Sequence, residues 1–81
     1  MLLEILTPGQ NVFKGEVKLV KVPGSGGSFE IMKNHAAIIS SLTDGELKVI
    51  TESGETLRYT TKDGVVEANN NHIVVLVESI K

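Results

Sequence analysis

The stretch Val12-Phe13-Lys14-Gly15-Glu16-Val17-Lys18-Leu19-Val20-Lys21-Val22 decides the fold class of this chain. Val17 and Leu19 have one parity along an extended strand, whereas Val20 and Val22 have the other. Side chains of a strand alternate between its two faces, so one extra residue near Leu19 or Val20 would turn the later ones to the opposite face. The stretch therefore predicts one long strand that is bent by a β-bulge.

Shorter strand candidates lie on both sides of this stretch, and turn residues separate them. The candidates are residues 2–6, 29–32, 36–42, 46–51, 56–60, 65–68 and 73–77. The predicted turns include Pro8-Gly9, Asp44-Gly45, Ser53-Gly54, Asp63-Gly64 and Asn69-Asn70-Asn71. Turns about ten residues apart are typical of sandwiches and barrels with short strands. The sequence predicts an all-β fold, a small two-sheet β-sandwich or flattened barrel of about eight to ten short strands.

The composition supports this fold class and limits the chain to one small domain. The 81 residues contain 23 Val, Ile and Thr against 3 Ala, a balance that favours strands over helices. A domain of this size leaves about 40% of its unfolded surface exposed, so its core is thin. The last candidate strand, residues 73–77, is apolar on both faces, and we expect both faces to be covered, one of them by another subunit.

Charge and cysteine content exclude several classes of function. The formal net charge is −2 and there is no dense run of Lys or Arg, so neither nucleic acid nor an anionic membrane surface is expected as a partner. The absence of cysteine excludes disulfides, thiolate zinc sites and thiol nucleophiles. No export signal or membrane-spanning segment is visible, because the longest aliphatic run covers only residues 73–77.

No catalytic, cofactor or metal site is expected from the residues themselves. The glycine-rich segment 23–28 lacks the Gly-Lys-Ser/Thr ending and the helix of a phosphate-binding loop, so it predicts an ordinary loop. His35 and His72 are far apart and form no zinc signature, which leaves a turn or core role for each. Ser40 and Ser41 lack the pattern of a nucleophile elbow.

One short motif indicates a carrier domain. Glu30-Ile31-Met32-Lys33 resembles the Glu-Ala-Met-Lys hairpin of biotinyl and lipoyl carrier domains, which are also small and all-β. That resemblance implies an exposed turn lysine, Lys33, that carries a prosthetic group. Asn34 stands where those domains have a second methionine.

A longer series of motifs runs in order from Leu3 to Ser79. Its members are Thr7-Pro8, Val12 to Val17, Pro23-Gly24, Gly27, Phe29, Ile31, Asn34 to Leu42, Gly45, Leu47, Gly64, Val66-Glu67, Asn71 and Val74 to Leu76. In this order and spacing they resemble the amino-terminal β-sandwich domain of the epsilon subunit of F-type ATP synthases. Because the resemblance covers nearly the whole chain, it is more specific than the carrier motif, which stays open as the alternative.

The chain departs from the family pattern at three places. Glu30 stands where the family usually has glycine, and Ala37 replaces a frequent proline after His-Ala. The family commonly continues into a carboxy-terminal helical hairpin, which in some members binds ATP and blocks rotation, whereas this sequence ends at Lys81. We therefore expect a single domain, residues 1–81, without the helical domain, that couples without inhibiting itself.

The resemblance implies a noncatalytic rotor subunit at the foot of the central stalk. Such a domain binds the gamma subunit through one face and the ring of c subunits through loops at one end. It couples ion translocation to ATP synthesis or hydrolysis without a cofactor. The resemblance also implies a peripheral position at the cytoplasmic face of a bacterial membrane.

Matching positions suggest which residues contact each partner. The segment from Ser25 to His35 corresponds to the family loop that meets the c-ring, and the contacts expected there are Ser28, Glu30, Lys33, Asn34 and His35. For Asn34 and His35 an equally good interpretation is that their side chains hold the turn together. Contacts to gamma are expected from Val74 and Leu76, provided that these side chains do not point into the core.

Overall fold

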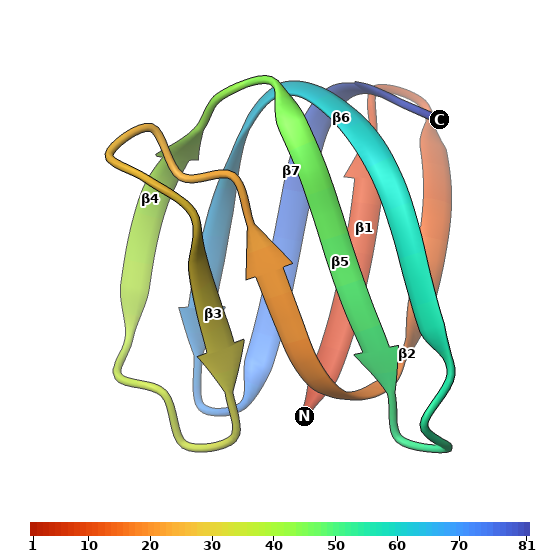
Figure 1. The fold of residues 1–81 in the computed structure, drawn as a ribbon, viewed down its shortest axis with the longest axis vertical. Coiled ribbons are helices and arrows are strands. Elements are labelled where there is room, and N and C mark those ends of the chain that lie inside the picture. The colour runs from red at the N-terminus through yellow and green to blue at the C-terminus, as the bar shows by residue number, and fades with distance from the viewer.

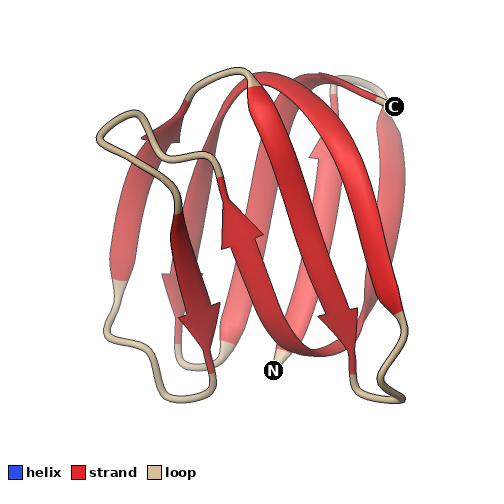
Figure 2. Ribbon diagram, in the orientation of Figure 1, coloured by secondary structure: helices blue, strands red, loops and turns tan.

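A computed structural model, which describes all residues from 1 to 81, contains seven strands and no helix (Figure 2). It therefore has no helix that could cross a membrane. The strands are β1 (Leu2–Thr7), β2 (Gln10–Val22), β3 (Phe29–Met32), β4 (Ile38–Leu42), β5 (Gly45–Thr51), β6 (Thr56–Asn69) and β7 (His72–Ile80). The predicted all-β class is confirmed.

Five of the strands close into a flattened barrel (Figure 1). Their order is β1-β7-β6-β5-β2, and β2 returns to pair with β1. The β1–β7 pair is parallel and all others are antiparallel. The two remaining strands extend the barrel wall, because β3 pairs with β2 and β4 pairs with β6. The barrel thus has two layers, with β1, β7 and β4 in one and β5, β2 and β3 in the other.

Strand β2 belongs to both layers because it bends in the middle. Its first part pairs with β1 up to the Leu2–Glu16 pair, and its second part pairs with β5 and β3 from Val17 onward. The register with β5 shifts between Val17 and Leu19, so the predicted bulge is present beside Leu19. After the shift Val20 and Val22 point into the core, as Val17 does before it.

Strand β6 is the second strand that serves both layers, and here the prediction of a turn at Asp63-Gly64 was wrong. The chain continues through these residues as one strand, whose first part pairs with β5 and whose second part pairs with β4. Asp63 instead forms a kink, with φ of 45°. Glycine is required next because a Cβ on Gly64 would lie 2.1 Å from the carbonyl oxygen of Leu76. Since segments 56–60 and 65–68 merge into one strand, seven strands replace the eight or more expected.

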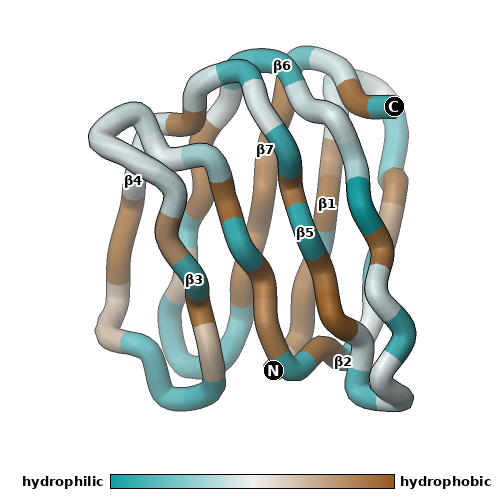
Figure 3. Tube along the Cα trace, in the orientation of Figure 1, coloured by the Kyte–Doolittle hydropathy of each residue, from teal (hydrophilic) through white to brown (hydrophobic).

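The core is a single cluster of fourteen buried apolar residues between the layers. Every strand contributes inward side chains that alternate with outward ones, as Figure 3 shows in the alternating hydropathy of β2 and β5. In β7 the inward residues are Ile73, Val75 and Val77, which are at most 3% exposed. The one buried polar side chain, Thr61, donates a hydrogen bond to the carbonyl oxygen of Gly45. No buried polar side-chain atom lacks a partner.

We expect Gly64→Ala to destabilise the barrel by about 1–3 kcal/mol, because the new methyl group would force β6 and β7 apart. Gly26→Ala is the matched control, since a Cβ there meets no atom within 4 Å, and it should change stability by less than about 0.5 kcal/mol. Urea unfolding of both variants measures the difference. Equal urea midpoints for the two variants would show that β6 and β7 can accommodate a methyl group at Gly64 without loss of stability.

Candidate interaction surfaces

The first candidate surface is the outer side of β1, β7, the second part of β6, and β4, here called the terminal-strand face. Across it, Leu6, Leu76 and Val65 occupy one row of the ladders, and Leu76 is 45% exposed. The next row contains Glu4, Val74 and Glu67. Val74 and Leu76 both lie outside the buried core cluster, so their side chains are free to contact a partner.

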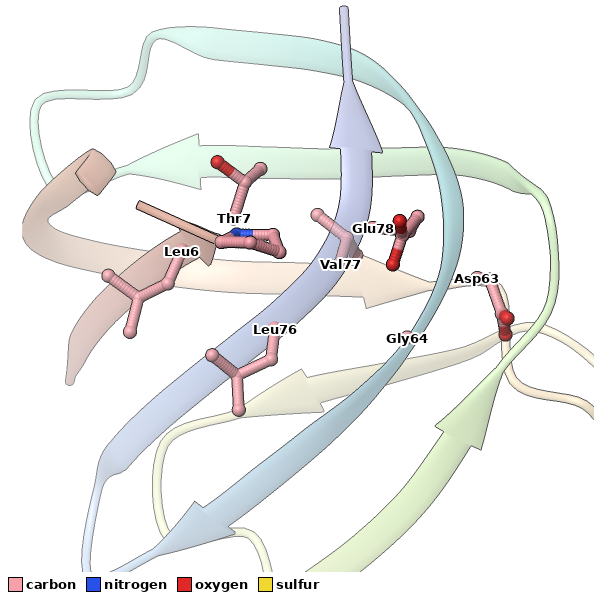
Figure 4. A pocket seen from close by; sticks show the side chains of 8 residues that line it. Leu6, Thr7, Asp63, Gly64, Leu76, Val77 and Glu78 are labelled. Atoms are coloured by element: carbon pink, nitrogen blue, oxygen red, sulfur yellow. The ribbon is translucent and has the colours of Figure 1, made fainter. Parts of the chain in front are cut away.

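A groove is cut into this face where β6 is kinked (Figure 4). Its volume is about 340 Å³, and it is lined by Leu6, Thr7, Pro8, Asp63, Gly64, Leu76, Val77 and Glu78. Leu6 and Leu76 project side by side from the paired strands β1 and β7. Two carboxylates, Asp63 and Glu78, stand at the other side. An apolar floor beside acidic groups suits the binding of a side chain that has an apolar part and a cationic part.

His72 lies on the same face and makes an ordered contact with Glu4. Its Nε2 lies 2.6 Å from Oε2 of Glu4, and the imidazole is 48% exposed. The prediction of a turn or core role for His72 was wrong, because the residue opens β7 with its side chain outward.

The sequence reasoning did not single out Leu6, Asp63 or Glu78 as functional residues. Leu6 could have been found from parity, because the alternation of β1 buries Leu3 and Ile5 and turns Leu2, Glu4 and Leu6 outward. Glu78 could have been found in the same way, because it continues the outward row of Val74 and Leu76 in β7, whereas the position of Asp63 follows from the kink that only the structure shows.

The second candidate surface comprises the five residues expected at the c-ring, and the structure separates them. Ser28 precedes β3, whereas Lys33, Asn34 and His35 follow it at the opposite end of the barrel (Figure 1). Glu30 lies between them on the outer side of β3, opposite Lys21 of β2. All five are exposed, but only Lys33, Asn34 and His35 share one loop.

Asn34 clamps this loop to the turn between β6 and β7. Its backbone N–H donates to Oδ1 of Asn71 at 2.7 Å, and Nδ2 of Asn71 donates to Oδ1 of Asn34 at 3.2 Å. Both residues have positive φ, 66° and 60°, which asparagine tolerates better than most residues. His35 is also engaged within the loop, because its Nδ1 lies 2.8 Å from the carbonyl oxygen of Ala36. The turn-holding interpretation of Asn34 and His35 is therefore supported.

Glu30 and Lys33 have no ion-pair partner within the chain, since the three ion pairs involve other residues. Both charges are therefore available to an external partner. The loop that carries Lys33 also differs from the hairpin that the carrier motif implies. Its flanking strands β3 and β4 pair with β2 and β6, and not with each other.

The chain is similar in sequence to proteins of one family. The family model described as "ATP synthase, Delta/Epsilon chain, beta-sandwich domain" matches residues 1–81. The ATP synthase epsilon chain of Protochlamydia amoebophila is 34% identical over 79 residues, which cover 98% of this chain and 54% of that relative. The ATP synthase epsilon chain of Pelagibacter ubique is 40% identical over 79 residues, with 96% and 60% covered. The chain thus spans little more than half the length of these relatives.

Solved structures show the same fold at lower sequence identity. A chain in the cryo-EM structure of the Euglena gracilis mitochondrial ATP synthase superposes with a TM-score of 0.94 at 18% identity, covering all of this chain and 52% of that one. A chain in the central stalk and c-ring structure of the Tetrahymena thermophila mitochondrial enzyme gives 0.85 at 17% identity, covering all of this chain and 65% of that one. The barrel with its two added strands is thus shared by these proteins.

The Asn34–Asn71 clamp can be tested by Asn71→Gly, which keeps the positive φ but removes the side chain. We expect faster hydrogen exchange of the Asn34 amide and a loss of about 0.5–1.5 kcal/mol in stability, the usual contribution of such hydrogen bonds. Asn70→Gly is the control, because Asn70 has φ of 52° in the same turn and makes no side-chain hydrogen bond. Equal exchange in the two variants would argue against the clamp.

Proposed function

Since the chain belongs to the family of ATP synthase delta/epsilon chain β-sandwich domains, we propose that it is a noncatalytic subunit of the rotor of an F-type ATP synthase. In this role it links the gamma subunit to the ring of c subunits and couples ion translocation to ATP synthesis or hydrolysis. The observation that carries the proposal is the family match over residues 1–81, supported by relatives named as epsilon chains. The subunit would lie peripherally at the cytoplasmic face of a bacterial membrane.

The architecture suits a part that transmits torque. A rotor subunit has to resist deformation between two attachment sites, and the five strands of a closed barrel have no free edge among them at which their ladder can open. Only the added strands β3 and β4 leave an edge unpaired. Here five strands close on themselves, and the chain forms 54 backbone hydrogen bonds over 81 residues. The two candidate surfaces lie on different parts of this closed unit, so it can hold two partners at once.

We assign gamma to the terminal-strand face, around Val74 and Leu76. The support is that β7 exposes apolar side chains on its outer side although its inner side already fills the core. A subunit that covers this face would remove both faces of β7 from water, as expected for a strand that is apolar throughout. Contiguous rows of exposed apolar side chains are typical of protein interfaces, whereas single exposed apolar residues are not.

We assign the c-ring to the β3 side of the domain, with Glu30 and Lys33 as its charged contacts. The support is that neither charge is used within the chain. Further polar contacts would come from Ser28, Asn34 and His35. Asn34 and His35 would make them through side-chain atoms that form no hydrogen bond within the chain. Because Ser28 lies at the other end of β3, the contact would extend along the strand as well as over the loop.

Leu76→Asp should prevent stable association with gamma, because it places a charge in an apolar interface. Central apolar anchors contribute about 2 kcal/mol or more, so affinity should fall roughly thirtyfold or further. Co-purification of the subunit with gamma, in the absence of c subunits, measures this. Met32→Asp is the control, since Met32 is 52% exposed on β3 and lies outside the terminal-strand face. Undiminished co-purification of Leu76→Asp would contradict the gamma assignment.

Reversal of the two free charges, by Glu30→Lys together with Lys33→Glu, should weaken attachment to the c-ring and leave gamma bound. We expect ATP hydrolysis in membrane vesicles to pump fewer ions per ATP, because like charges would now face each other across the contact. Glu46→Arg together with Arg58→Glu, which swaps the two partners of an ion pair between β5 and β6, is the control, because it also reverses one charge of each sign and leaves the net charge unchanged. Full pumping by the doubly reversed variant would rule out the contact at these residues.

A further inference from the structure

The groove of the terminal-strand face contains two opposed carboxylates. In the β6–β7 ladder, Lys62 pairs with Ser79 and Gly64 with Val77, so Asp63 and Glu78 occupy the position between these pairs. Like charges directly across a ladder destabilise the pair of strands. The two acids lie at the point where the kink, the close approach at Gly64 and the exposed Leu76 all meet.

Nothing within the chain neutralises these two acids. No lining residue of the groove is basic, and neither carboxylate takes part in an ion pair. The kink brings a further acid close, because Oδ1 of Asp44 accepts a hydrogen bond from the backbone N–H of Asp63 at 3.0 Å. Lys62, the nearest basic residue in sequence, lines a separate hollow at the end of the barrel.

The charge of the whole face has the same sign. Glu4, Glu67, Asp63 and Glu78 are its charged residues, and β1, β7, β4 and the second part of β6 present no Lys or Arg on it. Lys14 of β2 stands opposite Glu4 on the far side of β1 from the groove, and Lys62 of β6 stands opposite Ser79, next to Glu78 in β7. Apart from His72, which contacts Glu4, and Lys62 at the edge of the groove, the ionisable residues that border the apolar row are acids.

We propose that the groove between Leu6, Leu76, Asp63 and Glu78 receives an aliphatic side chain and an adjacent Lys or Arg from the gamma subunit. The aliphatic group would rest on the two leucines, and the cation would lie between the two carboxylates and remove their repulsion. The occupant is gamma because the groove is continuous with Leu76. The inference rests on the proposed function, and it names the kind of side chains of gamma that this face binds.

Two physical consequences follow from a cation held in this way. Attraction between a basic segment and an acidic groove speeds encounter, and added salt weakens this attraction. Removing the acids should therefore lower affinity mainly through association rate and flatten its dependence on salt. In the free subunit the same change should leave stability unaltered or raise it, because it relieves a like-charge contact. Binding and stability would then move in opposite directions, which a general disturbance of the fold cannot produce.

The test compares Asp63→Asn with Glu78→Gln in one variant against Glu52→Gln with Glu55→Gln in another. Asparagine tolerates the φ of 45° at position 63, so the kink is retained. The control removes the same charge from the turn between β5 and β6, outside the terminal-strand face. Binding of each full-length variant to gamma is measured by surface plasmon resonance at several salt concentrations, with thermal unfolding of the free subunit alongside.

We expect the groove variant to bind gamma roughly tenfold more weakly with a flatter salt dependence, at an unfolding midpoint no lower than that of the parent chain, whereas the control binds normally. An equal loss of affinity for gamma in both variants would show that only the net charge of the subunit matters, and it would overturn the inference. Normal binding by the groove variant, with Leu76→Asp still defective, would overturn it and leave the proposed function standing. If the parent chain does not bind gamma, both are overturned.

Discussion

Closure of the barrel requires that β2 and β6 each pass from one layer to the other without losing their ladders. A strand can do this only if its twist increases sharply at one point, which a bulge or a left-handed residue provides. In β2 the point is the register shift beside Leu19, and in β6 it is Asp63 with its φ of 45°. The fourteen-residue core, the added strands β3 and β4, and both candidate surfaces follow from these two bends.

The bend in β6 also determines the chemistry of the surface above it. A straight strand would place Gly64 at an ordinary distance from β7, and any small residue would fit there. The kink instead brings the backbone of Gly64 against Leu76 and Val77 and opens the groove beside them. The kink that the barrel needs and the groove of the terminal-strand face are therefore the same feature.

Much of the fold could be predicted from local patterns, because alternation, turn residues and one switch of parity are visible in the sequence. The bend of β2 was found because Val17, Leu19 and Val20 are all apolar and reveal the change of face. The bend of β6 was not predicted because an Asp-Gly pair occurs both in turns that reverse the chain and in kinks within one strand. Only the strands that pair with β6 before and after Asp63 distinguish these two cases. Likewise the sequence indicates that Asn34 favours a turn, but its partner Asn71 is 37 residues away and only the closed barrel brings them together. Ser28 and Lys33, by contrast, lie at the two ends of β3, a separation that the predicted strand at residues 29–32 already implies.

The two candidate surfaces are linked by a short route through the barrel. The loop with Lys33 is clamped through Asn34 to Asn71, and Asn71 lies in the two-residue turn that joins β6 to β7. Strand β7 then runs from His72 to Leu76 in the middle of the terminal-strand face, hydrogen-bonded on both sides to β1 and β6. Displacing the loop would therefore pull on the central strand of the other surface and not on a free segment. In the rotor role proposed above, this connection would make the clamp a mechanical element. It would give a reason why a short loop at the end of the barrel is tied down by side chains whose backbone geometry asparagine adopts more readily than most residues.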